Sequence, residues 1–386
     1  MTPRPILYVD HANNLGGAEQ SLLLLMTFLD HSRWQPHLIA PPGKLAEEAA
    51  RADIPVRTLD LPRLRGSSRS LLDWWQVSSS ISKTARNLNA ALIHSNTVRA
   101  TAYAALAARP SSRPLVWHMR DFWLSEAEPA PKWPDRLGKF ILSRMAALVL
   151  TNSHAVARHL PNSAKHSVLH NGIDLSRFDP ARVAAGNRAS ICSAAGFPPD
   201  APIVGMVGRA RPWKGQHTFL QMAGELAASA PDCRFLVVGG DPFQVNDNYE
   251  ASLKALCTQL GLDDRVHWTG QLADVRPALA AMDIFVHPGA PEPFGLVNTE
   301  AMAMSKPVVS FSHGALPEIV THNETGLLVA PSDTTALAAS VLRLLRDRVL
   351  CQSMGRAGRQ RVDSRFRIEH TVAQLEIHYQ DLVGRG

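Results

Sequence analysis

Two glutamates, eight positions apart, mark the segment of this 386-residue chain with the clearest chemistry. Glu292 lies in a turn rich in proline and glycine, and Glu300 is expected about two turns into the helix that follows. The free N–H groups at the start of that helix, at Gly295, Leu296 and Val297, suit a phosphate. A carboxylate, a phosphate-binding helix start and a second carboxylate, in this order, fit the hexose, diphosphate and ribose of a nucleotide sugar.

Two further segments suit a diphosphate. Arg209 and Lys214 flank a turn after an apolar run and could direct two cations at one anion, although a solvated basic turn explains them equally well. Gly16 and Gly17 precede an apolar helix and would let the backbone approach a phosphate. A tight strand-to-helix turn explains the two glycines about as well. No acidic residue ends the second predicted strand, which disfavours a nicotinamide cofactor.

These segments follow short apolar runs that alternate with helical stretches, a pattern typical of buried parallel strands. The first series is expected at 6–9, 37–40, 56–59, 92–94, 115–117, 147–150 and 168–169, and the second at 203–207, 235–238, 266–268, 284–287, 308–311 and 327–329. The sequence therefore predicts an α/β fold with two tandem Rossmann-like, doubly wound domains that face each other across a ligand-binding cleft.

The predicted domain boundary lies in a polar, proline-rich stretch after Asn171. We expect an N-terminal, acceptor-side domain at residues 1–180 and a C-terminal, nucleotide-sugar-binding domain at 181–367. Residues 368–386 have apolar positions at helical spacing. They predict a C-terminal helix that packs back near the seam between the domains.

The composition is that of a globular chain and disfavours several classes of protein. Hydrophobic residues make up 45% of the sequence and charged residues 19%, and the four cysteines are too widely spaced for a zinc site or a disulfide framework. No apolar run approaches the ~18 residues that cross a bilayer, and the first residues do not resemble a signal peptide. We therefore expect a cytoplasmic protein, at most peripheral on the inner face of the membrane.

The excess of positive charge is confined to the first domain. Residues 1–179 hold 21 basic and 14 acidic residues, a net charge of +7, whereas the remainder holds 19 and 20. Arg63 and Arg65, near two tryptophans, suit an anionic acceptor or an anionic membrane surface. The interpretation that we favour is a helix that begins at Trp74 and Trp75, packs on the sheet and leaves the arginines solvated. Leu71, Leu72 and Trp75 would form its core-facing stripe. Basic and aromatic residues do not interleave, so nucleic acid is not an expected partner.

The segment from Glu292 to Glu300 resembles the E-x7-E motif of retaining, nucleotide-sugar-dependent glycosyltransferases of the GT-B fold, the glycosyltransferase family 4 type. Further segments resemble other motifs of the family: its glycine turn (16–19), domain-linking signature (171–174), basic pair (208–215), strand end before the glutamates (287–288) and closing signature (314–329). The order and spacing of these segments extend the resemblance along nearly the whole chain.

The resemblance implies a role for each candidate residue. Arg209 and Lys214 would hold the diphosphate and stabilise the charge that develops on it. Glu292 would bind hydroxyls of the donor sugar, and Glu300 those of the ribose. Donor-binding contacts are further implied for Gly16, Gly17, Phe294, Gly295, Leu296 and Val297.

His118, at the end of a predicted strand, matches the family's acceptor-side histidine, which contacts the donor sugar near its reacting carbon. Outside that context a lone histidine at a strand end is more often a hydrogen-bonded structural residue. Arg120 and Asp121 follow it as acceptor-side candidates. Many relatives place an aspartate directly after the histidine, so this departure weakens the assignment of Asp121 to the sugar.

The resemblance assigns both signature glutamates to donor binding, which favours a front-face displacement with retention of configuration. The sequence contains no Asp-x-Asp motif, so neither a metal nor another cofactor is expected. The expected donor is a UDP-sugar or, as second choice, a GDP-sugar. The expected acceptor is a surface polysaccharide, a lipid-linked sugar or a small metabolite. A nucleotide-sugar 2-epimerase of the same architecture is the alternative enzyme, and a sugar-nucleotide-binding protein without catalysis is a third class.

Overall fold

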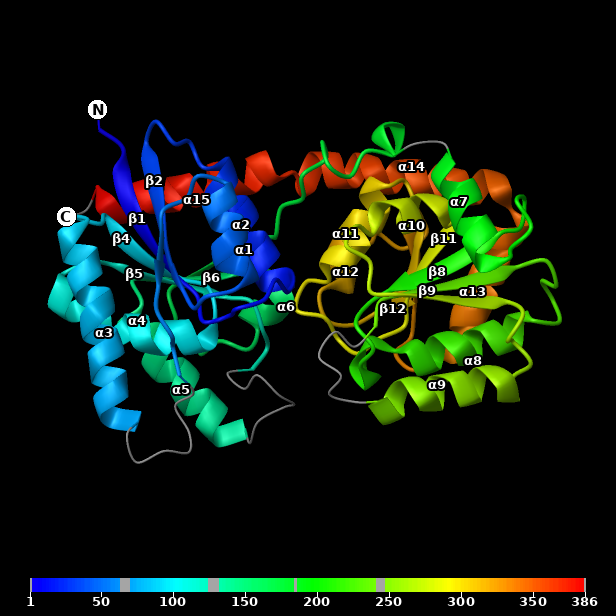
Figure 1. Cartoon of the computed structure of the whole chain (residues 1–386), viewed down its shortest axis with the longest axis horizontal. Coiled ribbons are helices and arrows are strands. Elements are labelled where there is room, and N and C mark those ends of the chain that lie inside the picture. Colours follow the sequence, from blue (N-terminus) through cyan, green and yellow to red (C-terminus); the bar gives the residue numbers. More distant parts are fainter. Residues whose placement is uncertain (1, 63–69, 124–131, 184–185, 241–246, 385–386) are drawn as a thin grey trace. The chain divides into compact units, whose positions relative to one another are not determined.

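The computed structural model describes residues 2–62, 70–123, 132–183, 186–240 and 247–384. The chain divides into two compact units, one formed by residues 1–172 together with 368–386 and the other by residues 173–367 (Figure 1). Among the described residues, no helix is long and apolar enough to span a bilayer.

The first unit is built on a seven-stranded parallel sheet with strand order β3-β2-β1-β4-β5-β6-β7. Its strands are β1 (Arg4–Val9), β2 (Trp34–Ala40), β3 (Val56–Thr58), β4 (Leu92–Ser95), β5 (Leu115–Met119), β6 (Leu148–Thr151) and β7 (His166–Val168). Its helices are α1 (Gly17–Phe28), α2 (Lys44–Arg51), α3 (Ser70–Asn87), α4 (Val98–Ser111), α5 (Lys132–Met145), α6 (His154–Ala157) and α15 (Ile368–Val383).

Both faces of this sheet are buried, because successive side chains of a strand point to opposite faces. Ile6 and Tyr8 of β1 pack in one core with α1, α2 and α15, whereas Leu7 and Val9 pack in a second core with α3 and α4. This two-sided burial explains why the strands appear in the sequence as continuous apolar runs.

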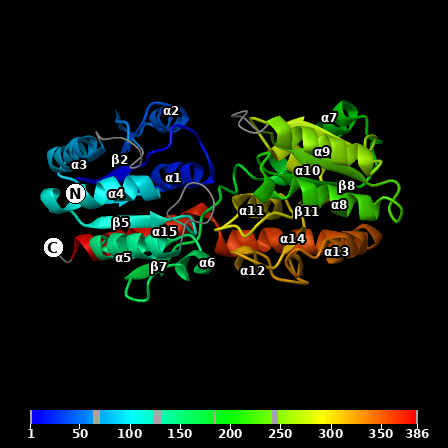
Figure 2. The same ribbon diagram turned by 90° about the horizontal axis from the view of Figure 1, so that it is seen from below.

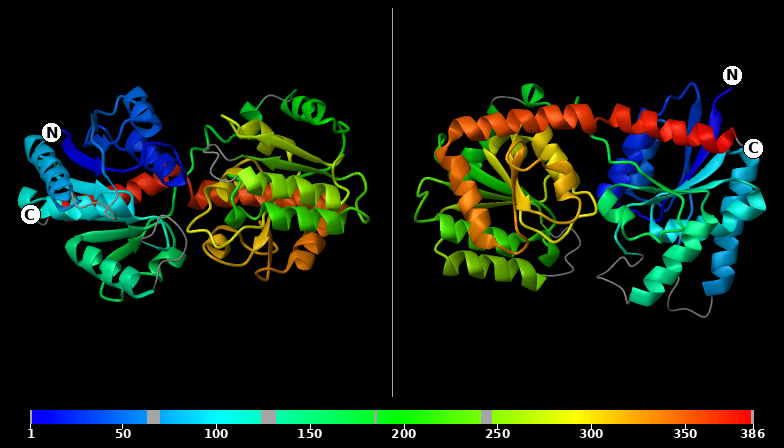
Figure 3. Two further views of the ribbon diagram at one scale, coloured as in Figure 1. Left: turned by 60° about the horizontal axis from the view of Figure 1, so that its bottom comes forward. Right: turned by 180° about the vertical axis from the view of Figure 1, so that it is seen from behind.

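The last helix, α15, belongs to the first unit although it follows the whole second unit in the chain. Val372, Leu375 and Tyr379 lie in the core beside α1 and β1, and the red helix is seen beside the blue elements in Figure 3. The sequence predicted a helix packed near the domain seam. Its apolar face completes the core of the first unit.

The boundary between the units lies at 172/173, eight residues before the predicted one. Backbone and side-chain contacts explain the difference. The N–H of Ile173 donates to the carbonyl oxygen of Phe366 at 2.8 Å, and Leu175 and Phe178 pack in a core of the second unit. These contacts attach the residues after Gly172 to the second unit.

The second unit is built on a six-stranded parallel sheet with strand order β10-β9-β8-β11-β12-β13. Its strands are β8 (Ile203–Val207), β9 (Arg234–Val238), β10 (Val266–Gly270), β11 (Ile284–His287), β12 (Val308–Phe311) and β13 (Gly326–Val329). Its helices are α7 (Gly186–Ala195), α8 (Gln216–Leu226), α9 (Asp247–Gln259), α10 (Arg276–Ala281), α11 (Leu296–Ala303), α12 (Leu316–Ile319), α13 (Thr334–Arg346) and α14 (Arg348–Arg365), with 3-10 turns at Pro180–Arg182 and Pro212–Lys214.

Helices cover this sheet on both faces as well. The core on one face includes side chains of α8, α9 and α13, and α8 and α9 lie side by side (Figures 1 and 2). The core on the other face includes α10, α11 and α14. Every predicted apolar run coincides with or overlaps a strand, which confirms the prediction of two Rossmann-like α/β units.

In each sheet the strand order reverses once, between β1 and β4 in the first and between β8 and β11 in the second. Open α/β sheets bind ligands outside the carboxyl ends of their strands at this point, because the loops there diverge to opposite faces. The loops after β1, β4, β8 and β11 are therefore the places to examine for a site.

Candidate active site

The loops after β8 and β11 lie against each other in the second unit. The N–H of Ala290 donates to the carbonyl oxygen of Trp213 at 2.7 Å. Gly215 has φ +82°, and a Cβ there would lie 2.4 Å from the carbonyl oxygen of Pro288. A residue with a side chain would therefore both strain the turn and force the loops apart.

This close approach brings Lys214 to Glu292. Nζ of the lysine lies 2.5 Å from Oε1 of the glutamate, and Nε2 of His287 lies 3.4 Å from the same oxygen. Burial raises the pKa of Glu292, but the ammonium of Lys214 and the imidazole of His287 outweigh it and hold the pKa of this carboxyl well below its usual range. Glu292 is therefore an anion throughout the neutral pH range.

The backbone of Glu292 is held by the loop after β12. The N–H of Ala315 donates to the carbonyl oxygen of Glu292 at 2.9 Å. Gly314 has φ +56°, and a Cβ there would lie 2.6 Å from that carbonyl oxygen. The predicted closing signature therefore positions the first glutamate.

Helix α11 begins at Leu296, after Gly295 with φ +84°. Glu300 is the fifth residue of the helix, so it lies little more than one turn in, not the two turns that the sequence suggested. The helix start leaves N–H groups of its first turn, including those of Leu296 and Val297, without a helical carbonyl partner. Burial raises the pKa of Glu300 to about 7, and the charge of Arg177 partly offsets this effect.

Two other predicted residues of the second unit lie in different surroundings. Arg209 is exposed, and its carbonyl oxygen accepts a hydrogen bond from Nε2 of Gln216 at 2.7 Å. The ring of Phe294 is only 2% exposed and packs edge to face on Phe366 at a centroid distance of 5.9 Å. The side chain of Phe294 thus belongs to the core.

In the first unit, Gly16 precedes α1 and Gly17 is its first residue. The N–H of Gly16 donates to Oε2 of Glu19 at 2.8 Å. This interaction was not predicted from the sequence, although glutamate at this spacing is typical of a helix start. Burial and the charge of Asp10 raise the pKa of Glu19 to about 7. Because Glu19 occupies the N–H of Gly16, the N–H groups of Gly17 and Ala18 are the ones left for a phosphate.

His118 ends β5 and is 1% exposed. Its Nδ1 lies 3.3 Å from Nε2 of His94 and 3.3 Å from Nη2 of Arg120. Its Nε2 is buried and has no hydrogen-bond partner within the described part of the chain. Burial, together with the charge of Arg120, holds the pKa of His118 well below its usual range, so the ring is neutral.

Arg120, predicted on the acceptor side, is 6% exposed and binds groups inside the first unit. Its Nε donates to Oδ1 of Asn96, and its Nη1 donates to Oδ1 of Asn171 at 2.6 Å. Burial lowers the pKa of Arg120 to about 10, and the carboxyls of Glu19 and Asp10 partly offset this effect. The neighbouring Asp121 is exposed.

Several polar residues of this group were not predicted from the sequence. Oδ2 of Asp10 accepts from Nδ2 of Asn96 at 2.7 Å, which links the ends of β1 and β4 at the switch point of the first sheet. Nδ1 of His94 lies 2.7 Å from the hydroxyl of Tyr379, which lies 2.9 Å from that of Tyr8. The available signal was a polar side chain within or just after an otherwise apolar strand.

The remaining acceptor-side candidates, Arg63 and Arg65, lie outside the described residues. The expectation that α3 buries Leu72 and Trp75 is wrong, because these side chains are 69% and 68% exposed. Trp74, also expected to pack inward, does so, and its ring meets that of Tyr103 edge to face at a centroid distance of 6.5 Å.

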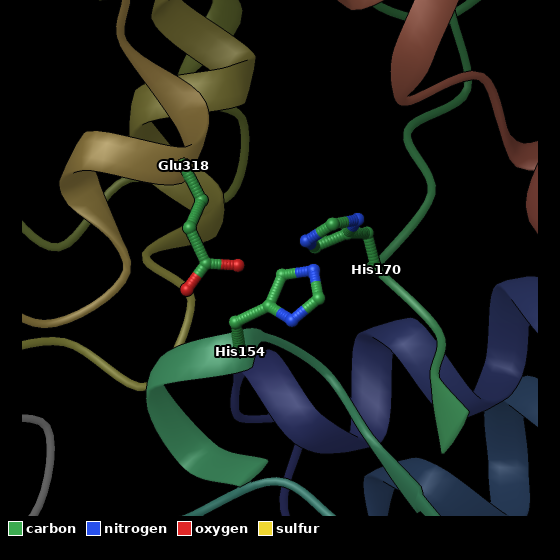
Figure 4. Close-up of side chains that lie close together, drawn as sticks. All are labelled: His154, His170 and Glu318. Carbon is green, nitrogen blue, oxygen red and sulfur yellow. The ribbon is translucent and has the colours of Figure 1, made fainter. Parts of the chain in front are cut away.

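Two further histidines of the first unit lie together. The rings of His154, on α6, and His170, after β7, are in edge-to-face contact at a centroid distance of 5.9 Å (Figure 4). Figure 4 also labels Glu318, which lies on α12 of the second unit. None of these three was a candidate from the sequence, and we assign them no role.

Comparison with known families gives two matches that together span most of the chain. The family described as "Glycosyltransferase Family 4" matches residues 15–177, and that described as "Glycosyl transferases group 1" matches residues 188–361.

Comparisons with individual proteins agree. The lipopolysaccharide core biosynthesis mannosyltransferase LpsB of Rhizobium meliloti (strain 1021) is 32% identical over 248 residues, which is 64% of this chain and 68% of LpsB. A GDP-mannose-dependent phosphatidylinositol monomannoside mannosyltransferase of Corynebacterium glutamicum is 31% identical over 223 residues, 55% of this chain and 53% of that protein. The crystal structure of Anabaena HepE in complex with UDP-glucose is 25% identical, with a TM-score of 0.80 over 97% of this chain and 99% of HepE.

Proposed function

We propose that this chain, which belongs to the group 1 and family 4 glycosyltransferases of the GT-B fold, transfers a hexose from a nucleotide diphosphate sugar to an acceptor hydroxyl with retention of configuration. The observation on which the proposal rests is the partly buried Lys214–Glu292 ion pair at the switch point of the second sheet, with Glu292 four residues before the start of α11. The loops after β8 and β11 thus bring together the cation of Lys214, the anion of Glu292 and the unpaired N–H groups at the start of α11.

Each group has a counterpart in a sugar nucleotide. Lys214 and Arg209 supply cations for the diphosphate, to which the N–H groups of Leu296 and Val297 add hydrogen bonds. A permanent carboxylate at Glu292 accepts hydrogen bonds from sugar hydroxyls. Glu300, one turn further along α11, accepts hydrogen bonds from the ribose.

In the first unit, two groups are available as hydrogen-bond donors. The N–H of Gly17 suits a phosphate oxygen, since a helix start carries partial positive charge. The Nε2 atom of His118 is buried without a partner in the described residues, and a hydroxyl or phosphate oxygen of the sugar nucleotide would satisfy it.

The proposed reaction is a front-face displacement. The acceptor oxygen bonds to the anomeric carbon on the face from which the diphosphate leaves, and the bond between that carbon and the diphosphate oxygen breaks. The proton of the acceptor hydroxyl passes to a phosphate oxygen of the leaving group. Glu292 takes no proton in this scheme, because Lys214 and His287 keep it ionised. Lys214 and Arg209 stabilise the charge on the leaving diphosphate.

For the donor we propose a UDP-sugar, supported by the HepE complex with UDP-glucose, and a GDP-sugar as the alternative that the C. glutamicum relative suggests. The test is a thermal-shift panel of UDP, GDP, ADP, UDP-glucose and GDP-mannose. A ligand at ~100 times its dissociation constant stabilises the native state by ~2.7 kcal/mol. We expect one nucleotide series to stabilise the chain and Lys214→Met to lose the response. No response to any nucleotide would refute the proposal.

For the acceptor we propose a surface polysaccharide, a glycolipid or a small metabolite, and an anionic membrane surface as a partner of the first unit. Support comes from α5, where four large apolar side chains are exposed: Trp133 (72%), Leu137 (49%), Phe140 (41%) and Ile141 (47%). They recur at the spacing of one helix face. Aromatic and aliphatic residues in such a stripe are typical of helices that lie in the membrane interface.

The charges on α5 favour an anionic surface. Arg136 and Arg144 are exposed on the same helix. Among the described residues of α5 the acidic one is Asp135, which is buried and accepts from Nζ of Lys139 at 2.6 Å. The exposed part of the helix is therefore apolar and cationic, which suits a peripheral membrane protein.

A further inference from the structure

A line of hydrogen-bonding side chains runs through the interior of the first unit and ends at His118. It passes from the hydroxyl of Tyr8 to that of Tyr379, then to His94, and from His94 to His118, with separations of 2.9, 2.7 and 3.3 Å. These four side chains are at most 1% exposed. Nη2 of Arg120 lies 3.3 Å from the same nitrogen of His118 that His94 contacts, Nδ1.

The direction of every bond in this line follows from one fact: a guanidinium only donates. Nη2 of Arg120 therefore donates to Nδ1 of His118, so that nitrogen has no proton. Nε2 of His94 must then donate to the same lone pair. The Nδ1 atom of a neutral His94 is then an acceptor, and the hydroxyl of Tyr379 donates a hydrogen bond to it.

Because these side chains are buried, the histidines and tyrosines of the line are in their neutral forms. Burial lowers the pKa of His94 to about 3, and it raises the pKa of the Tyr379 hydroxyl well above its ordinary value. The described ionisable groups that act on the line and on Arg120 are the carboxyls of Asp10, Glu19, Asp121 and Glu376, with Arg120 as the cation. None of the four side chains of the line therefore changes its ionisation state near neutral pH.

We propose that Tyr379 and His94 are positioning residues that, with Arg120, fix His118 in the tautomer with its proton on Nε2, so that His118 presents a hydrogen-bond donor and cannot act as a general base. This inference rests on the proposed function for the identity of the acceptor, a hydroxyl or phosphate oxygen of the sugar nucleotide. It gives α15 a chemical role, because Tyr379 comes from that helix. It also agrees with a reaction in which the leaving phosphate takes the proton.

The first test does not depend on activity. In 15N NMR of the whole chain labelled at its histidine rings, without ligand and at pH 7, we expect a pyridine-type Nδ1 and a pyrrole-type Nε2 for His118, identified by comparison with His118→Gln. In Tyr379→Phe we expect a second set of His118 signals, because His94 has lost the donor that orients it. The opposite tautomer in the native chain, or His118 signals unchanged in Tyr379→Phe, would overturn the proposal.

The second test uses release of UDP from UDP-glucose in the presence of acceptor. We expect Tyr379→Phe to lower kcat about tenfold, and His94→Gln, which keeps an N–H donor, to retain more activity than His94→Leu. Tyr103→Phe is the matched control, since the buried Tyr103 hydroxyl donates to the carbonyl oxygen of Pro62 at 2.9 Å in the same unit. It should lower Tm similarly and leave kcat within twofold.

A double-mutant cycle separates positioning from general destabilisation. In a His118→Ala background, Tyr379→Phe should cause no further loss of kcat while still lowering Tm. A loss that persists in that background, or one no larger than that of Tyr103→Phe, would contradict the role of Tyr379. If the NMR result holds but no nucleotide sugar is turned over, the proposed function fails and the positioning line stands.

Discussion

Lys214 and Glu292, 78 positions apart in the chain, form an ion pair in which Nζ lies 2.5 Å from Oε1. The pair joins the loops after the two central strands of the second sheet. Its geometry requires Gly215, whose backbone passes against the carbonyl of Pro288. A local glycine thus permits a contact between two distant segments, and that contact sets the ionisation of the glutamate.

Removing the cation should affect both catalysis and binding. Lys214→Met leaves the partly buried Glu292 without its ammonium partner and removes a charge from the proposed diphosphate site. We expect kcat/KM to fall by about 10²-fold or more, the scale for loss of one electrostatic group in an active site. Lys254→Met, on the exposed surface of α9, is the matched control and should change kcat/KM less than twofold. Equal effects of the two changes would contradict the assignment.

Glu292 should make stability depend on pH in acid. Its pKa is depressed in the folded chain, so the stabilising contribution is complete above its unfolded pKa of about 4.3 and is lost as pH falls below that value. Denaturant unfolding of the native chain and of Glu292→Gln should therefore show a stability difference that is largest above about pH 4.3. That difference should shrink in stronger acid. A difference that grows as the pH falls would have the wrong sign.

Glu300 should behave in the opposite way. Its pKa is raised to about 7 in the folded chain, so ionisation opposes folding as pH rises from the unfolded pKa through 7. Glu300→Gln should therefore gain stability relative to the native chain over this interval. Affinity for the nucleoside should instead improve with pH in the native chain alone, because a carboxylate is the better acceptor for ribose hydroxyls. Calorimetric titration with UDP at pH 6 and pH 8 measures this.

Metal removal should leave the reaction intact. The proposal gives Lys214 and Arg209 the electrostatic role that a divalent ion has in metal-dependent transferases. We expect EDTA to leave the release of UDP unchanged within twofold. Activity that is lost in EDTA and restored by a divalent ion alone would reject this part of the mechanism.

The α5 face should bind anionic vesicles. In a flotation assay, we expect the native chain to bind vesicles that contain phosphatidylglycerol and to bind less at high salt, since exposed charges are screened. Trp133→Ser with Phe140→Ser should abolish most of the binding. Leu106→Ser, an exposed apolar side chain on α4, is the control and should bind as the native chain does. Equal binding by all variants would dismiss α5 as the contact.

The fold could be predicted because its signals are local. Strands buried on both faces appear as continuous apolar runs, and Ile6–Val9 is one of them. The Lys214 and Glu292 segments were recognised because each follows such a strand. What could not be predicted depends on contacts between distant residues. Phe294 was predicted to contact the donor because it lies near Glu292 in the motif. Its ring instead packs on that of Phe366, 72 positions later in the chain.

The first unit shows the same limit. Arg120 follows the candidate histidine and was assigned to the acceptor, but Asn96 and Asn171 hold its guanidinium in the interior. Leu72 and Trp75 were expected in the core because apolar residues dominate the start of α3. Of the two tryptophans expected to pack inward, Trp74 does so and faces α4, whereas Trp75, one position away, is exposed. A rotation of about 100° per residue along a helix makes such an error invisible until the partner helix is known.

Helix α15 has a consequence for the synthesis of the chain. Residues 368–383 leave the ribosome only after all of 173–367 has been made, yet they supply part of the core of the first unit and the hydroxyl that faces His94. The apolar surface that α15 covers in residues 1–172 therefore stays exposed while nearly two hundred further residues are translated. Folding of the first unit cannot finish before that of the second has had time to begin, which makes the early nascent chain a client for chaperones.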